Sequence, residues 1–126
     1  MKDNTSTAEA PEQEKIVNGM NVTKLGATIR AIKGNPDIAA FQFRLTNRWQ
    51  NCGLNEARIN SYDGACQTIN REKDFVCTLD EPPVLLGNDR GPNPVEYLLA
   101  ALSGCMTTTL AYHAAAEDIK IESIQS

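Results

Sequence analysis

One stretch, residues 89–116, constrains the fold more than any other part of the sequence. It reads DRGPNPVEYLLAALSGCMTTTLAYHAAA, with apolar residues at three- and four-residue steps and alanines on the remaining faces. Asn93 is a suitable N-cap, Pro94 suits the first helical position, and Glu96 completes a capping-box-like arrangement. The pattern predicts one long helix, apolar nearly all round, that is buried on most sides as the central helix of the domain.

Cys105 lies in the middle of this predicted helix. It is either a buried structural thiol or a reactive thiolate, and the sequence leaves both interpretations open. The thiol is about three turns from the helix start, so the helix dipole acts on it only weakly. A thiolate at Cys105 therefore requires a cation from elsewhere in the protein. His113 lies about 12 Å further along the helix, too far to act as the base within one subunit, and we expect it to be a packed side chain.

The segment DEPPVLLGNDRGPNPVEYLLAALSGCMTTTLAYHAAA resembles the OsmC/Ohr family, the osmotically inducible and organic-hydroperoxide-resistance proteins. The similarity is most specific over residues 80–116 and extends more loosely back to Val17. The resemblance implies that Cys105 matches the peroxidatic cysteine of those members that reduce organic hydroperoxides. It also implies an intertwined homodimer whose sites form between subunits.

The sequence departs from the peroxidase members at three points. Those members have a catalytic glutamate directly after the Asn-Pro pair, where this chain has Val95, and Glu96 follows one residue later. Their resolving cysteine lies on a later helix, and their activating arginine lies on an N-terminal loop; neither has an aligned counterpart here. The resemblance therefore gives Cys105 and Glu96 as the candidate catalytic residues. It also predicts an OsmC-like domain over residues 14–126 that lacks the family's C-terminal half.

Two functions remain open on these residues. In the first, an OsmC-like redox protein acts in oxidative-stress defence as a thiol peroxidase, reducing organic hydroperoxides through Cys105. In the second, the protein keeps the OsmC fold and binds a small molecule or another protein without catalysis. An apolar helix around the thiol suits an apolar hydroperoxide better than hydrogen peroxide.

Composition excludes several other classes of protein. The formal net charge is −4 and the pI about 4.9, so neither nucleic acid nor an anionic membrane is an expected partner. No apolar run approaches the roughly 18 residues that span a bilayer. Residues 1–13 are polar, which predicts a disordered tail and no secretory signal.

The cysteines indicate reduced thiols. Four cysteines without a secretion signal are typical of a cytoplasmic protein. The sequence contains no Cys-x-x-Cys pair and a single histidine. We therefore expect no metal and no cofactor.

The remaining segments predict an α+β fold, with an antiparallel sheet packed on the buried central helix and an added N-terminal helix. Asn21 as N-cap and an apolar stripe from Val22 to Ile32 predict that first helix, with Gly34 just past its end. Alternation of apolar and polar residues predicts a meander of strands over residues 40–50, 57–62 and 75–79, a turn at 63–64, and a last strand over 119–122.

The predicted elements do not suffice to cover the central helix. Its apolar side chains face nearly every direction, whereas one sheet face and one amphipathic helix can cover only part of it. A large exposed apolar patch favours association. We therefore predict that the chain is not a stable monomer.

Overall fold

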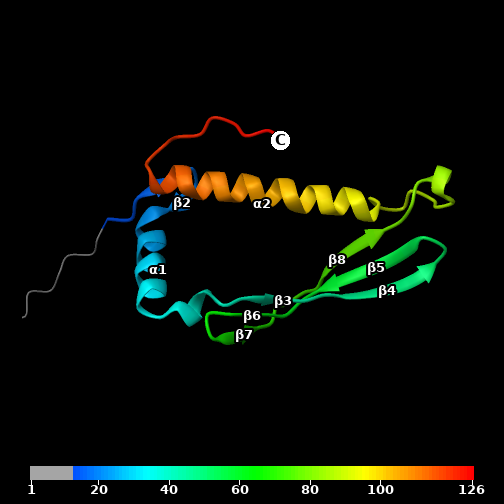
Figure 1. Cartoon of the computed structure of the whole chain (residues 1–126), viewed down its shortest axis with the longest axis horizontal. Coiled ribbons are helices and arrows are strands. Elements are labelled where there is room, and N and C mark those ends of the chain that lie inside the picture. The colour runs from blue at the N-terminus through cyan, green and yellow to red at the C-terminus, as the bar shows by residue number, and fades with distance from the viewer. Residues whose placement is uncertain (1–12) are drawn as a thin grey trace, which may run out of the picture.

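The computed structural model describes residues 13–126, so the tail predicted over residues 1–13 lies almost wholly outside the described residues (Figure 1). The helices are α1 (Val22–Gly34) and α2 (Pro94–Ala116), with short 3₁₀ turns η1 (Pro36–Ala39) and η2 (Pro83–Leu85). The strands are β1 (Ile16–Val17), β2 (Met20–Asn21), β3 (Gln42–Phe43), β4 (Thr46–Asn51), β5 (Leu54–Ile59), β6 (Tyr62–Gly64), β7 (Gln67–Ile69) and β8 (Phe75–Leu79). They pair antiparallel in the orders β1-β2, β3-β6-β7 and β4-β5-β8. This mixture of helices and antiparallel sheets confirms the α+β class.

Helix α2 begins as predicted. The Asn93 side chain accepts from the Glu96 N–H at 2.9 Å, and the Glu96 carboxylate accepts from the Asn93 N–H at 2.8 Å. These two bonds form a complete capping box, with Pro94 in the first turn. The local pattern of cap, proline and apolar spacing is therefore sufficient to place this helix.

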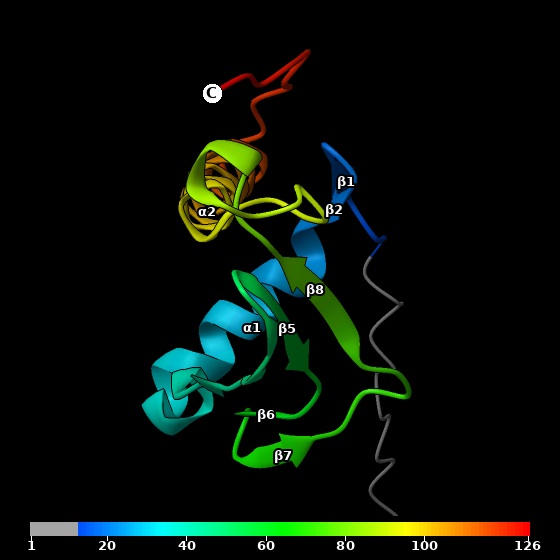
Figure 2. The same ribbon diagram turned by 90° about the vertical axis from the view of Figure 1, so that its right-hand side faces the viewer.

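The prediction that α2 is buried is wrong. Its large apolar side chains are 54% to 68% exposed, and only Ala114 and Ala115 are buried. The exposed side chains are those of Val95, Leu98, Leu99, Leu102, Met106 and Leu110. Figures 1 and 2 show the reason: the two three-stranded sheets lie on one side of α2 and do not wrap around it, and the β1–β2 hairpin lies only beside its C-terminal end. The helix is held at its two ends instead of along its length.

The first element of the described residues is a hairpin that was not expected from the sequence. β1 and β2 are joined by Asn18 and Gly19, whose φ angles of 50° and 78° are both left-handed, as a type I′ turn requires. The Asn-Gly pair was the signal for this turn. Helix α1 follows, and the Asn21 side chain accepts from the Lys24 N–H at 2.9 Å, as predicted for its N-cap.

Two details of α1 differ from the prediction. Gly34 is the last helical residue, and Asn35 follows as the cap. No residue of α1 is buried, so the apolar stripe does not form a packed core. Figure 1 shows why: α1 crosses from the end of α2 to the sheet layer and is covered by neither.

The strand predicted over residues 40–50 is in fact two strands in different sheets. β3 pairs with β6, and β4 pairs with β5, so the chain changes sheets at Arg44 and Leu45. The alternation of apolar and polar residues continues across this change because both strands have the same two-residue period. The period therefore could not reveal the break.

The segment after β5 also differs from the predicted meander. The strand predicted over residues 57–62 is divided between β5 and β6. Asp63 and Gly64 belong to β6 and pair with β7 instead of forming a turn, and the turn lies two residues later, at Ala65 and Cys66. β8 has the predicted bounds, 75–79.

The strand predicted over residues 119–122 does not form. The segment is held by the side chain of Asn18, whose Nδ2 donates to the Ile119 carbonyl at 2.8 Å and whose Oδ1 accepts from the Ile121 N–H at 3.0 Å. An ion pair between Lys15 and Asp118 at 2.9 Å lies beside it. One amide side chain therefore takes the place of a strand partner.

The buried apolar core of the described residues is small. It consists of Val17, Leu54, Ala57, Ala114 and Ala115. Large apolar side chains on the sheets, including Phe43, Trp49 and Phe75, are exposed. In the described part of the chain, no helix is long and apolar enough to cross a membrane.

Candidate functional site

The loop between β8 and α2 is built around Asp80. This carboxylate is only 2% exposed and accepts backbone N–H bonds from Glu81 at 2.8 Å, Asn88 at 3.2 Å and Arg90 at 3.3 Å. Burial alone would raise the pKa of Asp80, but the three backbone donors and the charge of Arg90 together lower it. A buried carboxylate with this many donors ties the loop into one conformation.

Two glycines allow close backbone approaches in this loop, one within the loop and one against β8. A Cβ atom on Gly87 would be 1.8 Å from the Glu81 carbonyl oxygen, and one on Gly91 would be 2.2 Å from the Thr78 carbonyl oxygen. The Tyr97 hydroxyl also donates to the Thr78 carbonyl at 3.0 Å. These contacts attach the first turn of α2 to the end of β8.

Cys105 is exposed on α2, so the interpretation of a buried structural thiol is wrong. It lines a shallow groove of about 460 Å³ together with Leu102, Met106, Thr109, Leu110 and His113. His113 is also exposed, so the prediction of a packed histidine is wrong as well. Because a thioether and two leucines form half of the lining, the groove suits an apolar ligand.

The structure does not bring the two candidate catalytic residues together within one chain. The Glu96 carboxylate is engaged in the helix cap with the Asn93 N–H. Nine residues separate Glu96 from Cys105, which corresponds to about 14 Å along the helix. Neither Lys nor Arg lines the Cys105 groove in the described part of the chain. The cation that a thiolate needs is therefore not supplied by these residues.

The other three cysteines lie outside the groove. Cys52 is exposed at the β4–β5 turn, where its thiol donates to the Leu86 carbonyl at 3.2 Å. Cys66 is exposed at the β6–β7 turn, and Cys77 is half-buried on β8. All four cysteines are free thiols, as predicted.

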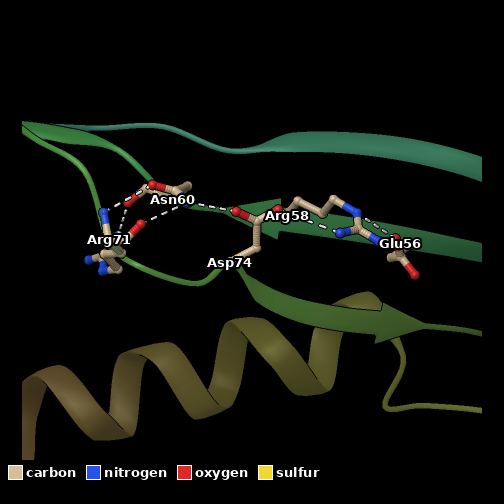
Figure 3. Close-up of polar contacts among 5 residues, drawn as sticks. All are labelled: Glu56, Arg58, Asn60, Arg71 and Asp74. Atoms are coloured by element: carbon tan, nitrogen blue, oxygen red, sulfur yellow. Dashed lines mark hydrogen bonds and ion pairs between the residues drawn. The ribbon is translucent and has the colours of Figure 1, made fainter.

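A second polar cluster, on β5 and the loop before β8, was not found from the sequence (Figure 3). Arg58 donates to the Glu56 carboxylate at 2.7 Å and 2.8 Å and to Asp74 at 3.5 Å. The Glu56 hydrogen bond and charge, with the help of Asp74, raise the pKa of Arg58. Asn60 donates to Asp74 at 2.6 Å and accepts from the Arg71 N–H at 3.0 Å. The sequence did contain a signal for this cluster: Glu56 and Arg58 have opposite charges and lie two residues apart on one strand.

Residues 13–126 contain no cluster of three or more His, Cys, Asp or Glu side chains arranged to hold a metal ion. The carboxylates of the β5 cluster are engaged with guanidinium and amide donors. Arginine and amide donors recognise anions, which makes this cluster different in kind from a metal site.

Residues 87–126 match the family model described as OsmC-like protein. The matched segment contains the end of the Asp80 loop, all of α2 and the residues that follow it, so it includes both Glu96 and Cys105. The match confirms the resemblance to the OsmC/Ohr family over this segment. No curated protein matches the chain.

Proposed function

We propose that this chain, which is OsmC-like over residues 87–126, reduces organic hydroperoxides through Cys105. The position of this thiol carries the proposal. Cys105 lies inside the matched segment, is exposed, and is flanked by the apolar lining of a groove on α2. A thiol that is both accessible and surrounded by apolar side chains is suited to a reactant with an oxidising group and an apolar body.

The proposed reaction starts with the Cys105 thiolate. Its sulfur attacks the terminal oxygen of the hydroperoxide, an S–O bond forms, and the O–O bond breaks. The leaving alkoxide takes up a proton and departs as an alcohol. The peroxide is thereby reduced by two electrons, and the cysteine is oxidised to a sulfenic acid. A second thiol, from another cysteine or a small external thiol, then condenses with the sulfenic acid to a disulfide and releases water.

The groove supports an organic hydroperoxide over hydrogen peroxide. Leu102, Met106 and Leu110 offer apolar contact beside the thiol. Burying apolar area contributes about 25 cal/mol per Å². Hydrogen peroxide has no apolar group that can use this contribution, so only an organic substrate gains from it.

We also propose that the active unit is a homodimer. The apolar residues around Cys105 are exposed in the single chain, as Leu102 at 58% and Met106 at 60% illustrate. A second copy would cover part of this surface, leave the groove open to the hydroperoxide, and supply the cation that the thiolate requires. Glu96 remains the second candidate catalytic residue, although its carboxylate caps α2 within one chain.

The test is the rate of peroxide reduction by a variant that keeps Cys105 and carries serine at Cys52, Cys66 and Cys77. Stopped-flow mixing with cumene hydroperoxide at pH 7 should oxidise this variant about a hundredfold or more faster than free cysteine, which is the gain expected if the associated protein supplies a positioned acid for the alkoxide. Hydrogen peroxide should react more slowly. Mass spectrometry should show one added oxygen on Cys105.

The matched control carries Cys105→Ser and keeps the other three cysteines, and it should show no fast phase. The enzymatic proposal is rejected if a folded, associated protein reacts no faster than free cysteine. Fast reaction in the Cys105→Ser control would assign the chemistry to another thiol.

One observation favours a second function, binding without catalysis. The Glu96 carboxylate is held in the helix cap, and in the described residues no Lys or Arg lines the groove of Cys105. On this alternative, an apolar ligand occupies the groove and Cys105→Ser leaves its affinity unchanged. Native mass spectrometry of the purified protein would detect a retained apolar ligand.

A further inference from the structure

We propose that the β4–β5 face holds a binding site for a small oxyanion, a carboxylate or phosphate group, and that Arg48 is the residue that binds it. A hollow of about 640 Å³ lies on this face, lined by Thr46, Asn47, Arg48, Gln50, Glu56 and Arg58. Its volume is within the range of small-molecule sites. The site is separate from the Cys105 groove, with which it shares no residue, so the inference does not depend on the proposed peroxidase activity.

Strand register places two arginines on one face of the sheet. Thr46 and Arg48 are two residues apart on β4 and therefore point to the same side. Arg58 is paired directly with Thr46, and Glu56 directly with Arg48, so both β5 residues share that side. A neighbouring hollow of about 230 Å³ adds Arg44 next to Thr46 and Arg58.

The carboxylates of this region neutralise Arg44 and Arg58. Arg44 pairs with Asp63 and donates to the Ser61 hydroxyl. Arg58 contacts the Glu56 carboxylate through Nε and Nη2 and the Asp74 carboxylate through Nη1. Figure 3 shows Arg58 lying between these two carboxylates, with Asp74 fixed in turn by Asn60.

Arg48 is left with its charge uncompensated. Glu56 is its direct cross-strand neighbour, yet the Glu56 carboxylate forms its ion pair with Arg58, at 2.7 Å. Across residues 13–126, no carboxylate lies within 4.0 Å of the Arg48 guanidinium, although the chain as a whole has a net charge of −4. An unpaired cation inside a hollow of an acidic protein is a specific point of attraction for an anion.

The lining chemistry matches an oxyanion. Arg48 presents a planar fork of N–H donors that fits a carboxylate or phosphate with two parallel bonds. Thr46 and Gln50 add a hydroxyl and an amide donor around it. The one carboxylate of the lining, Glu56, already accepts from Arg58. The hollow therefore offers more donors than acceptors.

Titration of the full chain with inorganic phosphate, and separately with succinate, tests the site. Binding is followed at pH 7 and low ionic strength by the ¹H–¹⁵N signals of Arg48 Nε–H and of the β4 amides. We expect saturable chemical-shift changes at Arg48, Thr46 and Gln50. The binding affinity should fall as salt is added. The relative affinities of the two probes tell whether a phosphate or a carboxylate is the better ligand.

Three variants decide the assignment. Arg48→Gln keeps a polar side chain on the exposed strand and should weaken binding at least about tenfold, since a charge-assisted bidentate contact is lost. Arg30→Gln, a matched control on α1, should bind like the unmodified protein. Glu56→Gln removes the only negative charge of the lining and should tighten binding.

Several results would overturn the proposal. These are the absence of saturable shifts with both probes, unchanged affinity in Arg48→Gln with circular dichroism showing an intact fold, and an equal loss in Arg30→Gln. Cys105→Ser should leave anion binding unchanged, so failure of the peroxidase proposal and failure of this one are distinguishable.

Discussion

At the scale of single residues, Asp80 determines how the chain enters α2. Backbone donors from Glu81, Asn88 and Arg90 outweigh the effect of burial and hold its pKa below the ordinary value of 3.8. A carboxylate whose pKa is lowered on folding stabilises the protein above its unfolded pKa, and this contribution is lost as the pH falls through the lower folded value. We expect Asp80→Asn to lower the urea midpoint at pH 7. The side-chain NH₂ of asparagine would face a backbone N–H that a carboxylate oxygen of Asp80 accepts, so that hydrogen bond would be lost. The difference from the unmodified protein should shrink below pH 3.8. The exposed Asp37→Asn serves as control, and a loss of the same size at pH 7 and pH 3 would contradict this account.

At the scale of elements, the β6–β7 hairpin has a turn that its residues fit poorly. Ala65 and Cys66 have φ angles of 52° and 61°, and a residue with a side chain costs about 1–2 kcal/mol in that region. The β1–β2 hairpin has the same pair of left-handed angles but uses Asn18 and Gly19, the favoured residues. We expect the double change Ala65→Asn and Cys66→Gly to raise the unfolding free energy by about 1 kcal/mol, measured by urea denaturation. Gly19→Ala, the reverse change in the first hairpin, should lower stability. A destabilised double variant would show that the Ala65–Cys66 turn is held by something other than its own backbone preference.

For the whole molecule, the exposed side of α2 is the basis of our prediction of the association state. Val95, Leu99, Leu102 and Met106 are each about 60% exposed, and such a continuous apolar surface favours a partner. We predict a homodimer in light scattering across a dilution series at micromolar concentration. Leu102→Asp should shift the mass toward the monomer while helical circular dichroism is retained, because the position is exposed within one chain. Thr28→Asp on α1 adds the same charge at an exposed position and should not change the mass. A cooperatively unfolding monomer of the unmodified chain would contradict the prediction.

Elements that form for local reasons could be predicted from the sequence. The bounds of α2 follow from Asn93, Pro94 and the apolar spacing, because a cap and a helical period act within four residues of each other. The bounds of β8 and the N-cap of α1 were also predictable, because strand alternation and helix capping depend on residues that are close in the sequence. The candidate thiol also came from the sequence, since Cys105 was identified by the motif around it and not by its surroundings.

Which segments contact one another depended on long-range contacts that the sequence pattern does not show. Strand pairing joins residues far apart in the chain, so the change of sheets at Arg44 and Leu45 has no local signature. Burial depends on what the rest of the chain can cover, and this is why an apolar α2 turned out exposed. Charge compensation depends on distance in space. Glu56 pairs with Arg58, and its cross-strand neighbour Arg48 has no ion pair among the described residues. Neither the composition nor the spacing of the charges in the sequence predicts this pairing.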